Sequence, residues 1–276
     1  MLSNLIQISR VPSQGEVRLQ GDIKFVPHLL GGGATQDLAI VAWVDCTVDR
    51  AYGFGIFFNR LMSSASNSSL CGVGGACGYE DNKESYGAYT TALSTALFKN
   101  AERCGACYEI MCVNSASCKP GGNTIVVTAT DFCPPNWGAT NAWCNPPRKH
   151  FDLSQPAFLQ IADYKAGVVP VHYRKVACKR SGGAKFTITG NPFFNLIEVT
   201  NVGGGGDIEK VEVRAEGRDR WIMLKRNWGE KWETDEKLAG SALTFRVTTT
   251  DGRFITSHNV TPKGWQFGQT FEGQNF

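Results

Sequence analysis

Ten cysteines, eight of them between Cys77 and Cys178, constrain the fold of this chain more than any other feature. So many thiols indicate disulfides, a metal site or redox chemistry. Cys104-Gly-Ala-Cys107 has the C-x-x-C spacing of a zinc or redox motif, but no second C-x-x-C or H-x-x-x-H pair follows, and the chain has four histidines. We therefore predict disulfides, an oxidising compartment and no metal.

The start of the chain does not match the secretion that disulfides imply. A secretory signal needs a basic region, an apolar run of roughly 7 to 15 residues and a small-residue cleavage site. The first residues, MLSNLIQISRVPSQGEV, interrupt their apolar run with Gln7, Ser9 and Arg10, so no signal peptide is recognisable. The apolar stretch 31–61 contains charged residues, and its uninterrupted runs are too short for a transmembrane segment. We therefore expect residues 1–71 to be an atypical N-terminal segment, either not native or poorly ordered.

Charge and size narrow the classes of protein that fit. A formal net charge of +3 on 276 residues lacks the strong basic excess of a nucleic-acid-binding domain, so we expect no nucleic-acid partner. A hydrophobic content of 42% suits globular domains with substantial cores. Two ordinary domains fit this length.

The absence of cysteine after Cys178 marks a boundary between these two domains. The polar stretch KRSGGAK, residues 179–185, is typical of a short linker, and no cysteine follows it. Before it, runs such as CYEIMC and NTIVVTATDFC predict strands, and residues 89–98 and 155–166 predict helices. After it, short strands at regular spacing, with a hairpin turn at Asp251-Gly252, predict a β-sandwich. We place the domains at residues 72–180 and 184–276.

Two carboxylates of the first domain are candidates for chemistry. Asp131 ends a predicted strand, and Asp152 stands with His150 just before the helix predicted at 155–166. Each also has a structural interpretation. An Asp at a strand end often closes a turn, and Asp152 and Ser154 offer oxygens that suit a helix N-cap. The residues alone leave both interpretations open.

Several segments, taken in order, resemble one protein family. The chain contains GGACGY, TTALSTALF, CGACYEI, VTATDFCPPN, WCNPP, HFDLSQPAF, GVVPVHYRKVAC, NWGEKW and GWQFGQTF. Over about residues 72–276 this set resembles the alpha class of plant expansins. The resemblance implies an all-β chain: a six-stranded double-psi β-barrel related to family 45 glycoside hydrolases, then an immunoglobulin-like β-sandwich that binds carbohydrate. It also implies four disulfides, which join Cys77 with Cys104, Cys107 with Cys178, Cys112 with Cys118, and Cys133 with Cys144.

The same resemblance implies a function. It predicts a secreted, extracellular protein of the plant cell wall, monomeric and without a cofactor. The expected partners are cellulose and matrix polysaccharides of the xyloglucan type, and the expected activity is pH-dependent wall loosening without hydrolysis. The chain departs from the family in two places. Cys46 and Cys71 lie outside the family's cysteine pattern, and SSASNSSLCGV replaces the strand and loop that normally line the groove, with Ser68 at the position of an Asp.

The lack of a residue that matches the catalytic base decides how the candidate groove is interpreted. Inverting hydrolysis needs a carboxylic acid and a second carboxylate roughly 6.5 to 9.5 Å away. By resemblance Asp152 matches the acid of the related hydrolases, and no residue matches the base. We predict that Asp131 and Asp152 bind a glycan in the groove and that His150 orients the loop. The alternatives are an endo-β-glucanase with Asp152 as acid and Glu80 or Asp81 as base, and a cellulose-binding protein without loosening activity.

The sandwich has its own candidate site. The resemblance places a polysaccharide platform at Phe193, Phe194 and Trp228, where aromatic faces would stack on sugar rings. Strand aromatics are more often buried than exposed. We therefore expect Trp221, Trp232 and Trp265 to belong to the core.

Overall fold

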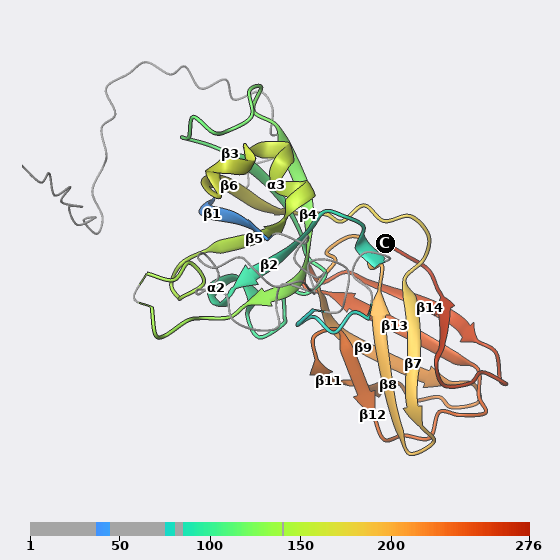
Figure 1. Cartoon of the computed structure of the whole chain (residues 1–276). Coiled ribbons are helices and arrows are strands. Elements are labelled where there is room, and N and C mark those ends of the chain that lie inside the picture. Colours follow the sequence, from blue (N-terminus) through green and yellow to red (C-terminus); the bar gives the residue numbers. More distant parts are fainter. Residues whose placement is uncertain (1–36, 45–74, 81–84, 140) are drawn as a thin grey trace, which may run out of the picture. The chain divides into compact units, whose positions relative to one another are not determined.

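Six strands close into a barrel (Figure 1). The computed structural model describes residues 37–44, 75–80, 85–139 and 141–276. The barrel strands are β1 (Asp37–Val44), β2 (Thr90–Ser94), β3 (Cys107–Cys112), β4 (Thr124–Cys133), β5 (His150–Ser154) and β6 (Val168–Val176). They follow the order β1-β5-β2-β4-β3-β6, with β1 parallel to β5 and β2 parallel to β4. The six-stranded barrel implied by the resemblance is confirmed.

Strand β1 corrects the expected start of this barrel. It lies between β5 and β6, parallel to the first and antiparallel to the second. Its residues Ala39 and Val41 are buried in the barrel core. Closure leaves no free edge only when every strand has two neighbours, so the barrel begins before residue 72 and the boundary predicted there is wrong. Cys46, Ser68 and Cys71 lie outside the described residues.

The two helices predicted in the barrel domain are shorter than expected. Within 89–98 the chain forms strand β2 and then a single turn, α2 (Thr95–Phe98). Strand β2 pairs with β4 and β5, and these sheet hydrogen bonds override the helical spacing of its apolar residues. Within 155–166 the chain forms α3 (Gln155–Ile161) and a 3₁₀ turn, η3 (Tyr164–Ala166).

Capping of α3 by a side chain is not observed. Ser154 occupies the N-cap position, but its hydroxyl donates to the carbonyl of Ala88 instead of accepting from the first turn of the helix. Asp152 lies within β5, where its carboxylate contacts His150. The cap interpretation of Asp152 is therefore wrong.

The second domain is the predicted β-sandwich. Its strands are β7 (Lys185–Asn191), β8 (Phe194–Thr200), β9 (Ile208–Ala215), β10 (Ile222–Met223), β11 (Lys225–Trp228), β12 (Lys231–Thr234), β13 (Leu243–Thr249), β14 (Phe254–Thr261) and β15 (Gln269–Glu272). One sheet has the order β10-β9-β13-β14 and the other β11-β12-β8-β7-β15. The hairpin expected at Asp251-Gly252 joins β13 to β14.

The core between these sheets contains two of the three predicted tryptophans. Trp232 and Trp265 are buried in it. Trp221 was expected there as well, but it is half-exposed and lies against the guanidinium groups of Arg214 and Arg246, at 4.9 and 4.2 Å from its ring centroid. Two cations that pack on one ring keep it at the surface, because burial would remove them from water.

The disulfides pair as the resemblance implies. They join Cys77 to Cys104, Cys107 to Cys178, Cys112 to Cys118 and Cys133 to Cys144. None of the helices in the described part of the chain has the length and hydrophobicity needed to span a lipid bilayer.

A buried carboxylate joins the sandwich to the barrel. Asp207, just before β9, is fully buried and accepts hydrogen bonds from Arg103 at 2.8 Å, from Lys175, and from the Thr250 hydroxyl at 2.8 Å. Arg103 and Lys175 belong to the barrel domain. The same junction includes Gly229, where an added Cβ would lie 2.1 Å from the carbonyl oxygen of Cys77. The backbones therefore approach too closely for any other residue.

Candidate functional site

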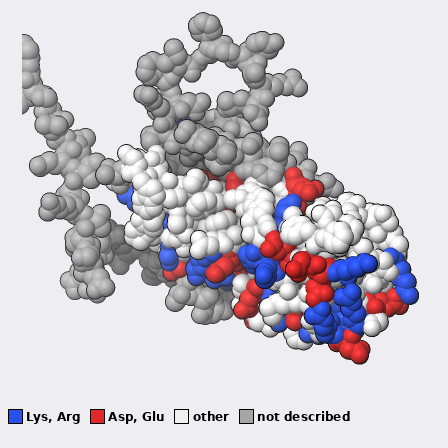
Figure 2. All heavy atoms as spheres, turned by 90° about the horizontal axis from the view of Figure 1, so that it is seen from below, with Lys and Arg blue, Asp and Glu red and all other residues white. Residues whose placement is uncertain are grey.

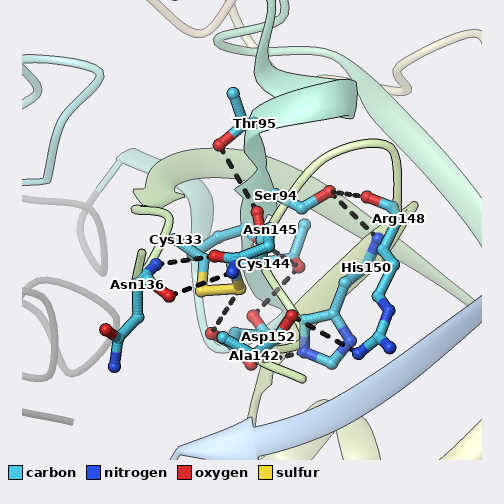
Figure 3. The surroundings of a disulfide bond; sticks show 12 residues. Ser94, Thr95, Cys133, Asn136, Ala142, Cys144, Asn145, Arg148, His150 and Asp152 are labelled. Atoms are coloured by element: carbon cyan, nitrogen blue, oxygen red, sulfur yellow. Dashed lines mark hydrogen bonds and ion pairs between the residues drawn. A yellow bond between two sulfur atoms is a disulfide. The ribbon is translucent and has the colours of Figure 1, made fainter. Parts of the chain in front are cut away.

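The first candidate site is a buried carboxylate beside a disulfide (Figure 3). Asp152 on β5 places one oxygen, Oδ1, 2.9 Å from Nε2 of His150. Its other oxygen, Oδ2, lies 4.0 Å from Sγ of Cys144. The Asp152 side chain is 6% exposed and that of His150 is 1% exposed. The carboxylate is thus held by its neighbours and offers little surface to solvent.

Strand alternation explains why Asp152 lies outside the barrel core. Phe151 and Leu153 point into the core, so His150, Asp152 and Ser154 point to the other face of β5. All five residues are nevertheless buried. The loop closed by the Cys133–Cys144 disulfide covers this outer face, as Figure 3 shows.

Several contacts hold His150 in place. Its backbone N–H donates to the Ser94 hydroxyl at 3.0 Å, and that hydroxyl donates to the carbonyl of Arg148 at 2.9 Å. Trp143 stacks on the imidazole, with ring centroids 6.0 Å apart and planes 17° apart. The guanidinium of Arg148 lies 5.4 Å from the Trp143 ring. These contacts fix the imidazole that binds Asp152.

The sheet register places Asp131 and Asp152 on one rung. Ala92 of β2 pairs with Asp131 of β4 on one side and with Asp152 of β5 on the other. A β-bulge between Thr91 and Ala92 sets this register. Two strand spacings put the Cα atoms of the carboxylates about 10 Å apart. The structure therefore brings both predicted groove carboxylates to one face, separated by a small side chain.

Asp131 also has a structural task. Its Oδ1 accepts a hydrogen bond from the backbone N–H of Ala76 at 2.7 Å. At Gly75 an added Cβ would lie 2.6 Å from the carbonyl oxygen of Thr130. Asp131 thus holds the glycine-rich segment 75–78 against β4.

Glu80, one of the two residues suggested as the base of a hydrolase, contacts the sandwich. Glu80 lies 3.6 Å from the ammonium of Lys231 and donates its backbone N–H to Glu198, and both partners belong to the sandwich. Asp81 lies outside the described residues. Cys133, Cys144 and Asp152 bring sulfur and oxygen atoms within 4.8 Å of one another, but the two sulfurs are bonded to each other and are not thiolate ligands.

The second candidate site is open. Phe193, Phe194 and Trp228 are 83%, 38% and 49% exposed. Phe194 begins β8, where Asn195 and Ile197 face inward, so Phe194 faces outward. Trp228 pairs with Lys231, which precedes the buried Trp232, so Trp228 lies on the same outer face. Phe193 is in the β7–β8 turn. The structure thus brings the predicted platform residues Phe194 and Trp228 to one sheet face, with Phe193 at its edge.

Charged side chains lie beside Trp228 on this face. Lys231 is 3.2 Å from Glu198, and the Glu198 side chain is mostly buried. Burial raises the pKa of Glu198, and the Lys231 ammonium partly opposes this shift. Figure 2, which draws one face of the molecule, shows basic and acidic side chains next to one another on the described surface. Such mixed charge suits a neutral ligand better than a polyanion.

Comparisons with known proteins identify the family. Residues 90–173 match the family model described as lytic transglycolase, and residues 184–262 match the expansin C-terminal domain. Expansin-A32 of Oryza sativa subsp. japonica is 56% identical over 208 residues, which cover 73% of this chain and 77% of the relative. The chain belongs to the expansin A family.

Further relatives agree with this assignment. Expansin-A23 of Arabidopsis thaliana is 54% identical over 203 residues, 72% of this chain and 73% of the relative. The crystal structure of apo-Clavibacter michiganensis expansin superposes with a TM-score of 0.60 at 19% identity and covers 87% of this chain and 97% of that chain. A mutant of the same bacterial expansin in complex with cellohexaose gives a TM-score of 0.58 at 20% identity, over 86% of this chain and 96% of that chain. At this identity the two structures support the fold alone.

Sequence reasoning missed several residues of this expansin that belong to the two sites. Trp143, which covers His150, stands in the WCNPP segment and is 41% exposed; Trp137 in the same loop is 75% exposed. The sequence does contain a signal for them, because a tryptophan within a polar, turn-rich loop is expected to be exposed. Lys231 and Glu198 had no such signal, because their pairing depends on the register of β12 and β8.

Proposed function

We propose that this expansin is secreted to the plant cell wall and loosens it as a monomer, without a cofactor. It binds cellulose and matrix polysaccharides of the xyloglucan type and displaces their non-covalent contacts without hydrolysis. The observation that carries this proposal is the outward-facing aromatic set Phe193, Phe194 and Trp228 on an open sheet. A polysaccharide is too long to enter a closed pocket, so its binding site must be an open surface. Exposed aromatic faces on such a surface can stack on the sugar rings.

Two further observations support binding without cleavage. The carboxylate of Asp152 lies 2.9 Å from Nε2 of His150, and that of Glu80, one proposed base, lies 3.6 Å from the Lys231 ammonium of the sandwich. The relatives are named expansins, and an expansin of the same fold has been solved with cellohexaose. A carboxylic acid without a second carboxylate that activates water cannot complete an inverting cleavage.

One observation favours an endo-β-glucanase instead. Asp131 and Asp152 lie on one rung of the barrel sheet, with Cα atoms about 10 Å apart. Carboxyl groups roughly 6.5 to 9.5 Å apart are those of inverting glycosidases. The amide N–H of Ala76 occupies one oxygen of Asp131, so we rank this function second.

The test measures three activities on one pair of variants. Trp228→Ala removes a platform ring, and Phe254→Ala, which removes a ring that is 62% exposed on the opposite sheet, is the control. We expect Trp228→Ala to lose binding to cellulose and creep of isolated walls, and Phe254→Ala to retain both. Unchanged binding of Trp228→Ala would refute the platform. Soluble reducing ends released from a glucan by the wild-type protein, and lost in Asp152→Asn, would establish the hydrolase instead.

A further inference from the structure

One row of side chains crosses the whole outer face of the platform sheet. The register pairs Trp228 with Lys231, Lys231 with Glu198, Glu198 with Thr187, and Thr187 with Thr270. Residues on one rung point to the same face. We call this set the transverse row. Four strand spacings give it a length of about 19 Å, with an aromatic ring at one end and hydroxyl groups at the other.

A cavity of about 520 Å³ opens along the hydroxyl end of the transverse row. Thr187, Glu198 and Thr270 line it together with Thr200 of β8. Its volume is in the range of sites that hold small ligands. Its lining is mostly polar, so a ligand there would be held by hydrogen bonds.

Glu198 points to such a ligand. It is 7% exposed, and its Oε1 accepts the backbone N–H of Glu80 at 3.4 Å. Its Oε2 lies 3.2 Å from the Lys231 ammonium but has no hydrogen bond of good geometry. The ammonium partly compensates this buried oxygen, which can still accept further hydrogen bonds. A donor that enters the cavity would supply one.

The chemistry of the cavity fits a neutral sugar. Its carboxylates accept hydrogen bonds, the Lys185 ammonium donates them, and the Thr187 and Thr270 hydroxyls, 2.8 Å apart, can do either. Sugar hydroxyls need this mixture of donors and acceptors. Among the described residues, no group of carboxylates with metal-binding geometry lies at this cavity. Glu198 and Glu272 in its lining would repel an anion.

The transverse row and the aromatic platform diverge from Trp228. From the rung of Trp228, Phe194 lies four residues along β8, about 13 Å, and two strands across, about 10 Å. The aromatic line therefore runs diagonally over the sheet, whereas the transverse row runs straight across the strands. A linear chain that lies on both aromatic rings leaves the cavity to one side.

We propose that the cavity on the transverse row is a subsite for a sugar branch, so that this sheet binds branched β-glucans in preference to unbranched ones. The backbone of the glucan lies along the aromatic line, and its branch enters the cavity beside Glu198 and Thr187. This inference rests on the proposed function, because it takes the platform as the site of the backbone.

The test compares two ligands with the same backbone. Calorimetry measures binding of cellohexaose and of a β-1,4-linked glucose hexamer that bears single-sugar branches. Thr187→Val removes one hydroxyl without a change of shape, and Thr187→Phe fills the cavity. Thr248→Val on β13, a half-exposed threonine of the other sheet that does not line the cavity, is the control.

The branched ligand should bind the wild-type protein more tightly than cellohexaose. We expect Thr187→Val to weaken the branched ligand about threefold to tenfold, the effect of one lost hydrogen bond, and to leave cellohexaose unchanged. Thr187→Phe should abolish the preference, and Thr248→Val should preserve it. Equal affinity of the wild-type protein for both ligands would overturn the branch subsite while the platform stands. If the wild-type protein shows no branch preference and Trp228→Ala loses both ligands, the platform stands without the branch subsite. Failure of both ligands to bind the wild-type protein would overturn both proposals.

Discussion

Removal of the buried charge of Asp207 should weaken the junction of barrel and sandwich. Asp207→Asn keeps the shape of the side chain but leaves the charges of Arg103 and Lys175 without their carboxylate. Breaking a buried ion pair by removal of one partner costs about 3 to 5 kcal/mol. Here the side chains of Arg103 and Lys175 are 24% and 31% exposed, so water can solvate part of each charge. We therefore expect the free energy of unfolding to fall by about 2 to 3 kcal/mol, below that range.

Urea denaturation followed by tryptophan fluorescence measures this loss. The sandwich contains four tryptophans and the loop beside Asp152 contains Trp137 and Trp143, so the signal reports both domains. Asp163→Asn is the control, because Asp163 pairs with Lys119 at the surface, with side chains 58% and 38% exposed. An exposed pair of this kind contributes about 0 to 1 kcal/mol.

A double-mutant cycle isolates the ion pair from other effects of the substitution. Arg103→Met removes one cation, so Asp207→Asn should cost less in that background than in the wild-type protein. A loss below about 0.5 kcal/mol for Asp207→Asn, or the same loss in both backgrounds, would refute the argument that Asp207 joins the domains through these charges.

Three more predictions concern stability. Gly229→Ala should destabilise the protein by several kcal/mol, because Gly229 has φ of +55° and an added Cβ would lie 2.1 Å from the Cys77 carbonyl oxygen; a melting temperature equal to that of the wild-type protein would contradict this. Burial raises the pKa of Glu230 from its ordinary value of 4.5 to about 8, so its contribution is complete below pH 4.5 and is lost as pH rises through about 8. The free energy of unfolding, measured by urea titration at several pH values, should fall over that range by more in the wild-type protein than in Glu230→Gln. An equal fall in both proteins would count against this contribution of Glu230. Replacement of Cys133 and Cys144 by Ser opens a loop with a sequence separation of 11 and should lower the free energy of unfolding by about 2 to 3 kcal/mol, measured by urea denaturation. An unchanged free energy of unfolding would show that the disulfide does not stabilise the fold.

The sandwich could be predicted because its strands and turns are indicated by residues close together in the sequence. Alternation along β8 and β13 and the turn at Asp251-Gly252 are visible within a few residues. The resemblance supplied the cysteine pairing, which spacing alone leaves open. The strands of the sandwich therefore followed from local patterns, and the barrel followed from the resemblance.

The parts that failed depend on contacts between distant residues. Strand β1 pairs with β5 and β6, more than 100 residues later in the chain, and nothing near Asp37 indicates those partners. The rung of Asp131 and Asp152 could not be predicted, because it depends on Thr130, an extra residue of β4 opposite the step from Thr91 to Ala92, and a shift of one residue turns a side chain to the other face. Trp221 stays at the surface because of two arginines from other strands.

The contrast between the two candidate sites bears on the proposed binding of a glycan without hydrolysis. A general acid must reach the glycosidic oxygen within hydrogen-bond distance. The carboxylate of Asp152 is 6% exposed and already bonded to His150, so it would have to leave a satisfied contact to meet a sugar. The rings of Phe193 and Trp228 need no such rearrangement, because they are exposed before any ligand arrives. Binding energy is therefore available at the sandwich at little conformational cost, and we expect contact with the polymer to begin there.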